Sequence, residues 1–231
     1  MGAALDLFNV LLEPTAVFER VRERPKVLAP FLVICVLQIV IGAINLPFTQ
    51  AAMHAMAAAR PAAPAGAPDP AKFAVIGLIF VPVALLIAYL IGAGLLWILT
   101  SLMSGEAKFT TLLSVTTYAS ITGVLLAVAG VAVLRLRGID SVTSMADLQP
   151  ALGLDLLVPD AGRFLTAVLK AINPFSIWGL VLTAIGVTVT HKTTKGMGYA
   201  IATVAFLIGV VFAAGIAGMF GGMGGAPGRS S

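Results

Sequence analysis

The residues best suited to chemistry in this chain are few and lie far apart in the sequence. The two histidines, His54 and His191, and the single cysteine, Cys35, lack the spacing of a metal site. No serine lies in a Gly-x-Ser-x-Gly turn, and no apolar segment contains a His or Asp that could activate one. We therefore expect a protein that is not an enzyme, with no catalytic residue, no metal and no cofactor.

The composition is typical of a membrane protein. Of 231 residues, 59% are hydrophobic and 10% are charged, against about 45–50% and about 25% in soluble domains. The mean hydropathy is +1.05 and the net charge is +4. These values exclude disordered, collagen-like and disulfide-rich secreted chains and argue against a nucleic-acid-binding domain.

Five uncharged apolar segments are long enough to cross a bilayer, which takes about 20 residues. They predict an all-α, polytopic bundle of five transmembrane helices, with spans at about 28–46, 75–103, 110–134, 174–190 and 198–220. The second segment contains Pro82 and is too long for one straight crossing, so it should tilt or kink. Because these spans hold no ionisable side chain, proton coupling within the bilayer is disfavoured.

The rest of the chain divides around this membrane domain, residues 27–223. Residues 1–26 form an amphipathic cytoplasmic segment, with no short apolar region of a cleavable signal before Val27. The Pro/Ala tract at 60–70 predicts an extended linker. The Gly-rich C-terminus lacks the strand, loop and helix of a phosphate-binding site, so 224–231 is expected to be a flexible tail.

Five crossings place the two termini on opposite sides of the membrane. With the N-terminus inside, the 14 Lys and Arg residues divide seven against seven. The cluster Arg20–Lys26 lies just before the first span, whose flank usually dominates orientation. We therefore favour a cytoplasmic N-terminus and an outward C-terminus.

Two extramembrane regions have amphipathic helical patterns. The N-terminal segment reads as two short helices broken at Pro14, with the apolar stripes Leu5/Phe8/Leu12 and Val17/Phe18/Val21. This segment could lie in the headgroup region, pack on the protein's own loops or dock a cytoplasmic partner. The second region has its stripe at Phe164, Leu165, Val168, Leu169 and Ile172, with Asp160 as the expected N-cap, and predicts an interfacial helix leading into the fourth span.

Two groups of cations lie next to predicted spans. Contact with anionic lipid headgroups is the ordinary role of such residues. In the loop after the fourth span a ligand site is the alternative. The candidate headgroup contacts are Arg20, Arg22, Arg24, Lys26, Lys192 and Lys195.

Small residues four apart and uncharged polar residues are expected to hold the helices together. The stripes are Ala205/Gly209/Ala213/Ala217/Gly221, Ala84/Ala88/Gly92 and Ala119/Gly123/Ala127. They favour close packing within the bundle, with contact to a second copy as the alternative. Interhelical hydrogen bonds are expected from the polar residues Gln38, Thr100, Thr116, Thr117, Tyr118, Ser120 and Thr183.

Three motifs resemble one known family. Asn173–Gly186 (NPFSIWGLVLTAIG) resembles the fourth-span signature of bacterial members of the Yip (Ypt/Rab-interacting protein) domain family. Leu11–Pro25 (LLEPTAVFERVRERP) and Phe109–Ser120 (FTTLLSVTTYAS) are similar to that family's N-terminal segment and third-span start. The resemblance runs from about Leu7 to Gly218. Its signature and packing residues map onto Asn173, Pro174, Phe175, Trp178 and Gly186.

The resemblance implies five helices, a cytoplasmic N-terminus and an outward C-terminus, and it defines no catalytic residue. The eukaryotic branch of the family is linked to vesicle traffic and small GTPases and often carries an Asp-Leu-x-Gly-Pro motif. This chain has no such motif and only about 27 residues before the first span, so GTPase binding is not carried over.

The sequence thus predicts a non-enzymatic, multi-pass protein of the bacterial cytoplasmic (inner) membrane. Its partners would be membrane lipids and another membrane protein or a second copy of the chain, with no nucleic acid and no metal. The alternative is a small permease or transporter subunit with a path lined by uncharged polar residues. A lipid-modifying enzyme is a weaker third class, because no acid, base or nucleophile arrangement supports it.

Overall fold

The computed structural model describes residues 2–58, 70–149, 151–158 and 162–220, and within these ranges every regular element is a helix. The all-α prediction is confirmed. Residues 60–69 of the predicted linker (60–70), the tail at 224–231 and Asp160 lie outside the described residues. Pro70 is the first residue of α4, and Gly162 is the N-cap of α7, so the prediction of Asp160 as that N-cap is wrong. Five segments are long and apolar enough to cross a membrane: α3 (Leu28–Ala58), α4 (Pro70–Ser104), α5 (Phe109–Ala119) with α6 (Ile121–Arg137), α8 (Pro174–His191) and α9 (Lys195–Phe220).

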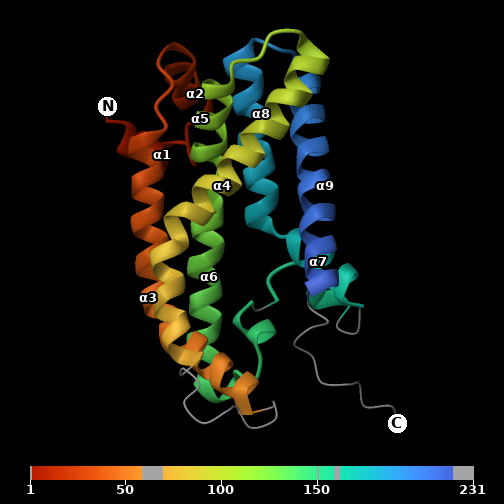
Figure 1. Cartoon of the computed structure of the whole chain (residues 1–231). Coiled ribbons are helices and arrows are strands. Elements are labelled where there is room, and N and C mark those ends of the chain that lie inside the picture. Colours follow the sequence, from red (N-terminus) through yellow and green to blue (C-terminus); the bar gives the residue numbers. More distant parts are fainter. Residues whose placement is uncertain (1, 59–69, 150, 159–161, 221–231) are drawn as a thin grey trace.

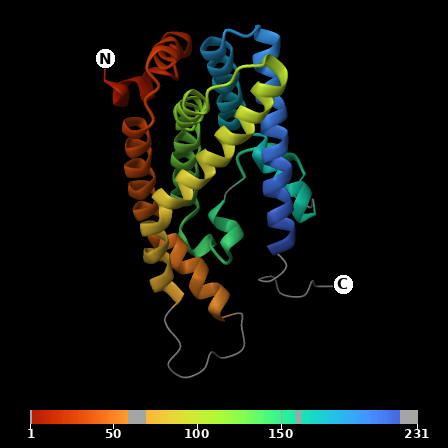
Figure 2. The same ribbon diagram turned by 45° about the horizontal axis from the view of Figure 1, so that its top comes forward.

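These segments run up and down beside one another in a single bundle (Figure 1). The α5–α6 pair contacts α3, α4 and α8, while α9 packs on α8 and α4. Helix α4, with Pro82 in its interior, crosses the bundle obliquely, as its 35 residues require (Figures 1 and 2).

The two ends of the bundle carry different short helices (Figure 1). The N-terminal end carries α1 (Ala3–Asn9) and α2 (Pro14–Glu23), together with the α4–α5 and α8–α9 connections. The opposite end carries the 3₁₀ turns η1 (Ile139–Ser141), η2 (Met145–Leu148) and η3 (Leu154–Leu157), and helix α7 (Arg163–Ala171).

The third apolar segment is interrupted at Ser120, where the sequence predicts one continuous helix. Around the break, hydroxyls donate to nearby carbonyls: Thr117 to Leu113, and Ser120 back to Thr117. Side chains that donate in this way compete with the backbone ladder and bend helices. Ser120 also bonds the Tyr89 hydroxyl of α4 at 2.6 Å, so the break is held by a neighbouring helix.

Helix α3 continues through Pro47 to Ala58, beyond the predicted span at 28–46. Past the proline, Phe48 and Ala52 are buried against Leu134 of α6 and Val142 of the following segment. Burial of this apolar face stabilises the extension of the helix despite the missing donor at the proline.

The core reaches out of the membrane segments and into the N-terminal helices. Val17, Phe18 and Val21 of α2 are buried in the same cluster as Val115 and Leu182. The second predicted stripe therefore packs on the protein itself. Helix α1 instead buries its Leu7 and Val10 side, leaving the stripe Leu5/Phe8/Leu12 exposed.

Most hydroxyls of the bundle bond within their own helix, which corrects the expectation of interhelical bonds. Thr117 and Thr183 donate to carbonyls four residues earlier, at 2.8 Å each. Buried Oγ1 atoms of Thr100 and Thr116 have no partner. Two of the seven predicted residues form interhelical bonds in the described structure: Ser120 with Tyr89, and Tyr118 with the Ala3 carbonyl. Bonds within one helix are favoured because a Ser or Thr hydroxyl can reach a carbonyl of its own helix, whereas an interhelical bond needs a matching group on a neighbouring helix.

The glycines at which two helices approach most closely are not those of the predicted small-residue stripes. Of the glycines in the predicted stripes, a Cβ at Gly92 would make an ordinary contact with Thr116 at 3.4 Å, and one at Gly123 or Gly209 would meet no described atom within 4 Å. At Gly198 of α9, a Cβ would overlap the Thr188 hydroxyl of α8 and lie 2.7 Å from the Ala184 carbonyl oxygen. The α8–α9 pair therefore depends on a glycine that lies outside the small-residue stripes.

We predict that Gly198→Ala lowers stability by about 1–3 kcal/mol, the usual cost of overpacking a tight contact. Thermal unfolding of the purified protein in detergent measures the effect. The matched control is Gly196→Ala in the same helix, where a Cβ meets nothing within 4 Å and stability should hold or rise. Equal unfolding midpoints for the two variants would contradict the close α8–α9 approach.

Candidate functional site

The N-terminal end of the bundle is held together by an ion pair. The Arg20 guanidinium donates to both oxygens of Asp6, from Nη2 at 2.7 Å and from Nε at 3.3 Å. Asp6 is buried, and the bidentate geometry gives a strong, directional contact. Arg20, predicted as a headgroup contact, thus joins α1 to α2.

The remaining predicted cations at this end are exposed. Arg22 donates to the Val189 carbonyl at 3.4 Å and so connects α2 to the end of α8. Lys192 caps α8 with a left-handed backbone (φ 52°), and Lys195 opens α9. Within the described ranges, none of the five exposed residues pairs with a carboxylate: Arg22, Arg24, Lys26, Lys192 and Lys195.

The fold brings these two groups of cations to one end, although more than 160 residues separate them in the sequence. Helix α2 packs directly on α8, whose last turn leads into Lys192 (Figure 1). A small cavity of about 210 Å³ is lined by Glu23, Arg24 and Lys26, and also by Tyr118 and the Asp6–Arg20 pair. This arrangement offers several cationic donors to an anion at the membrane surface.

The alternative prediction, a ligand site at the α8–α9 loop, gains no free imidazole from His191, because both ring nitrogens of His191 have partners. The Lys108 backbone N–H donates to His191 Nε2 at 3.3 Å, and the Thr190 hydroxyl lies 2.8 Å from His191 Nδ1. His191 therefore links the start of α5 to the end of α8.

Two exposed tryptophans lie at opposite ends of the bundle. Trp97 of α4 donates to the Ala107 carbonyl at 3.2 Å, next to the start of α5. Trp178 lies in the second turn of α8, at the other end. Tryptophan is enriched at both membrane–water interfaces, so these residues mark the two surfaces of the bilayer.

Asn173 forms the joint between α7 and α8. Its Oδ1 accepts from the Ser176 backbone N–H at 3.0 Å, while its Nδ2 donates to the Lys170 carbonyl and to Ser176 Oγ, each at 2.9 Å. Pro174 is the first residue of α8, as predicted. Asn173 is buried and its polar atoms are fully used, which gives it a structural role.

The other family-signature residues do not meet in one site. Phe175 is half-buried, whereas Trp178 is exposed. Gly186 is buried farther along α8, where a Cβ would lie 3.1 Å from the Phe18 ring. Gly186 thus allows α2 to pack closely on α8.

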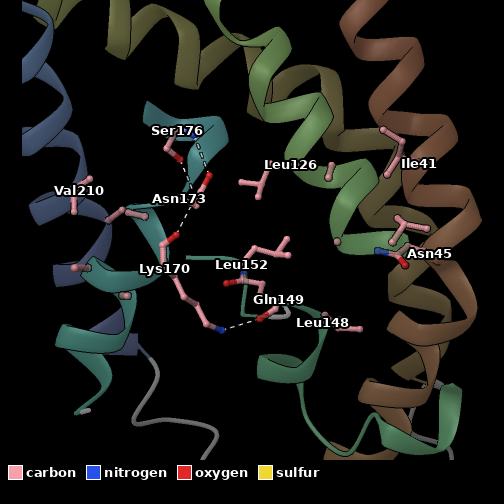
Figure 3. Close-up of a pocket in the computed structure, with 17 residues that line it drawn as sticks. Ile41, Asn45, Leu126, Leu148, Gln149, Leu152, Lys170, Asn173, Ser176 and Val210 are labelled. Atoms are coloured by element: carbon pink, nitrogen blue, oxygen red, sulfur yellow. Dashed lines mark hydrogen bonds between the residues drawn. The ribbon is translucent and has the colours of Figure 1, made fainter. Parts of the chain in front are cut away.

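A larger cavity, of about 570 Å³, lies at the opposite end of the bundle (Figure 3). Its walls come from α3, α6, α7, α8, α9 and the segment around η2, so no single sequence motif could predict it. Lys170 Nζ donates to the Gln149 carbonyl at 2.8 Å across its polar side. On the α3 side, the buried Oδ1 of Asn45 has no hydrogen-bond partner among the described residues.

The η2 wall of this cavity is held by a carboxylate. Burial disfavours the charge on Asp147, but hydrogen bonds from the backbone and hydroxyl groups of Thr143 and Ser144 outweigh that effect and lower the pKa of Asp147. The four donors lie 2.8–3.1 Å from Oδ2. Asp147 is therefore ionised at neutral pH and keeps the neighbouring Leu148 and Gln149 in the wall.

Gly153 allows the segment after η2 to pack closely on the end of α7 in the cavity wall. A Cβ at Gly153 would lie 2.7 Å from the Ile172 carbonyl oxygen and 2.8 Å from that of Leu169. Leu154 N–H donates to the same Ile172 carbonyl at 3.1 Å. This contact between backbones, which places Leu152 against the cavity, needs a residue without a side chain.

An apolar groove of about 580 Å³ lies between α4, α5, α8 and α9. The hydroxyl residues Thr116, Ser120, Ser176 and Thr183 line it among small and apolar side chains. Ser176 also lines the cavity at the opposite end, so the two hollows adjoin at this residue.

Comparisons with known proteins agree with this architecture. Residues 8–217 match the Yip1 domain. The chain is 28% identical over 211 residues to membrane protein YknW of Bacillus subtilis (strain 168). The aligned region covers 89% of this chain and 87% of that protein. No solved structure matches the chain. The helical membrane bundle described here belongs to the Yip1 domain family.

Proposed function

We propose that the protein is not an enzyme and acts through contacts with lipids and other membrane proteins in the cytoplasmic (inner) membrane of a bacterium. The N-terminus would be cytoplasmic and the C-terminus outside. The observation that carries this proposal is the group of five exposed cations at the N-terminal end, none of which forms an ion pair with a carboxylate of the described residues. Each Lys or Arg near an anionic membrane surface contributes about 1 kcal/mol of attraction.

Two further observations support the proposal. The similar Bacillus protein is itself named a membrane protein. The exposed stripe Leu5/Phe8/Leu12 of α1 lies at the same end as the cations, where it can enter the interface beside them.

The test is photoreactive phosphatidylglycerol in vesicles holding the full chain, with labelled peptides mapped by mass spectrometry. Because both groups of cations share one end, Lys192→Gln/Lys195→Gln should lower labelling of the peptide that contains Arg24 and Lys26 at least twofold. The double variant Arg137→Gln/Arg163→Gln at the opposite end is the matched control and should leave that labelling unchanged. Equal labelling in all three proteins would contradict a shared lipid-contacting end.

A second candidate function is a solute path, favoured by the adjoining hollows that meet at Ser176. The buried Thr116 Oγ1 lines the groove and has no partner, so it could bind a passing solute. Thr117, by contrast, donates to Leu113 at 2.8 Å within its own helix.

Under the leading proposal, liposomes with the protein should release small polar solutes no faster than protein-free liposomes. Selective release that falls at least tenfold in Thr116→Val and persists in Thr117→Val would replace that proposal with the permease. The two variants are matched in size and chemistry, and only the first alters the groove.

A further inference from the structure

We propose that the cavity at the opposite end binds an anionic lipid, with the headgroup at Lys170 and one acyl chain between α6 and α9. This inference deepens the proposed function, on which it rests, by assigning a built site and a ligand class. The site is separate from the exposed cations at the N-terminal end, since its walls are α3, α6, α7, α8, α9 and the η2 segment.

Polar and apolar side chains both line the cavity: Lys170 and Gln149 lie near its outer end with Leu148 and Leu152, and Leu126 lies deeper, with Ser176 at a similar level (Figure 3). Lys170, in the last turn of α7, and Gln149, just after η2, lie in the layer outside the long helices. Leu126 and Ala127 lie deeper on α6, some ten residues from its end at Arg137, and Val210 faces them from α9. The single cation of the lining, Lys170, is thus at the outer end, where a lipid headgroup lies, and the apolar surface of α6 and α9 extends inward from it.

The charge at the polar side is available to a ligand. Lys170 pairs with no carboxylate in the ranges that the structure describes, and its bond to the Gln149 carbonyl uses one of the three ammonium donors. The neighbouring carboxylates are used locally: Asp147 accepts from Thr143 and Ser144, and Asp155 accepts from the Gly153 N–H. An incoming phosphate therefore meets a cation with two open donors.

The cavity also holds a polar atom that the protein leaves unsatisfied. Oδ1 of Asn45 is buried and receives no hydrogen bond from the described residues, which is unfavourable for a polar atom. Asn45 lies beside Ile44, whose carbonyl accepts from Arg135 at 3.2 Å, near the end of α6. A headgroup hydroxyl, such as that of phosphatidylglycerol, supplies the missing donor at this level.

The position of the cavity suits a lipid as well. Trp178 and the exposed Phe164 and Leu165 of α7 mark this end as an interface, where headgroups lie. A volume of about 570 Å³ falls within the roughly 300–1,000 Å³ of small-ligand pockets, so it suits one chain and part of a headgroup.

The test uses vesicles that contain the full chain and a lipid with a photoreactive acyl chain, either phosphatidylglycerol, phosphatidylcholine or a free fatty acid. Labelled peptides are mapped by mass spectrometry. Phosphatidylglycerol should label the cavity peptides around Leu126 and Val210 at least threefold more than phosphatidylcholine. The fatty-acid arm shows whether the anionic group must be a phosphate or any acid on an acyl chain.

Two variants and a control make the test specific. Lys170→Gln should remove the preference for the anionic lipid, while Ala127→Leu should fill the cavity and lower labelling with every lipid. Arg163→Gln, a cation of the same helix that does not line the cavity, is the matched control and should behave as wild type. A thermal unfolding midpoint within a few degrees of wild type confirms that each variant is folded.

Equal labelling by phosphatidylglycerol and phosphatidylcholine, or a preference that survives Lys170→Gln, would overturn this inference. The same samples report labelling of the peptide that contains Arg24 and Lys26. Labelling there without labelling in the cavity would overturn the cavity site and leave the proposed function standing. Loss of labelling at both the Arg24/Lys26 peptide and the cavity peptides would contradict both the proposed function and the cavity site.

Discussion

The constraint on which this structure depends is that a bilayer offers no hydrogen-bond partner to a polar group. Backbone groups are satisfied by long helices, and most side-chain hydroxyls donate to carbonyls of their own helix, as Ser114, Thr183 and Thr188 do. Charges are confined to the ends. Contacts between helices within the membrane therefore depend on close packing at small residues, such as the glycines Gly186 and Gly198.

The same constraint explains why the two ends differ. At the N-terminal end, the Asp6–Arg20 pair allows α1 and α2 to bury apolar side chains against the bundle without leaving a charge unpaired. At the opposite end, Asn173 satisfies the joint of α7 and α8, and Asp147 satisfies the turn at η2. Among the described residues, four buried side-chain oxygens have no hydrogen-bond partner. Two of them, Asn45 Oδ1 and Thr116 Oγ1, lie along the cavity and the groove, whereas those of Thr100 and Thr193 do not.

Much of the fold could be predicted from the sequence, because hydropathy and helix signals act locally. The five apolar segments, the oblique course of the helix with Pro82, and the start of α8 at Asn173-Pro174 follow from such signals. The break at Ser120 was missed, since it depends on several hydroxyls bonding backward at once. The stripe with Gly209 was misleading because four-residue spacing shows which residues share a face and not which neighbour meets it. The large cavity could not be predicted, since six separate parts of the chain form its walls.

The central claim is that five crossings place the N-terminal end, with α1 and α2, in the cytoplasm and the cavity with Lys170 at the outer surface. A topology reporter fused before Met1 and, separately, after Ser231 of the full chain tests it most directly in the living cell. The account predicts a cytoplasmic signal for the first fusion and an outside signal for the second. Signals from the same side would contradict the five-crossing bundle, and reversed signals would contradict the orientation.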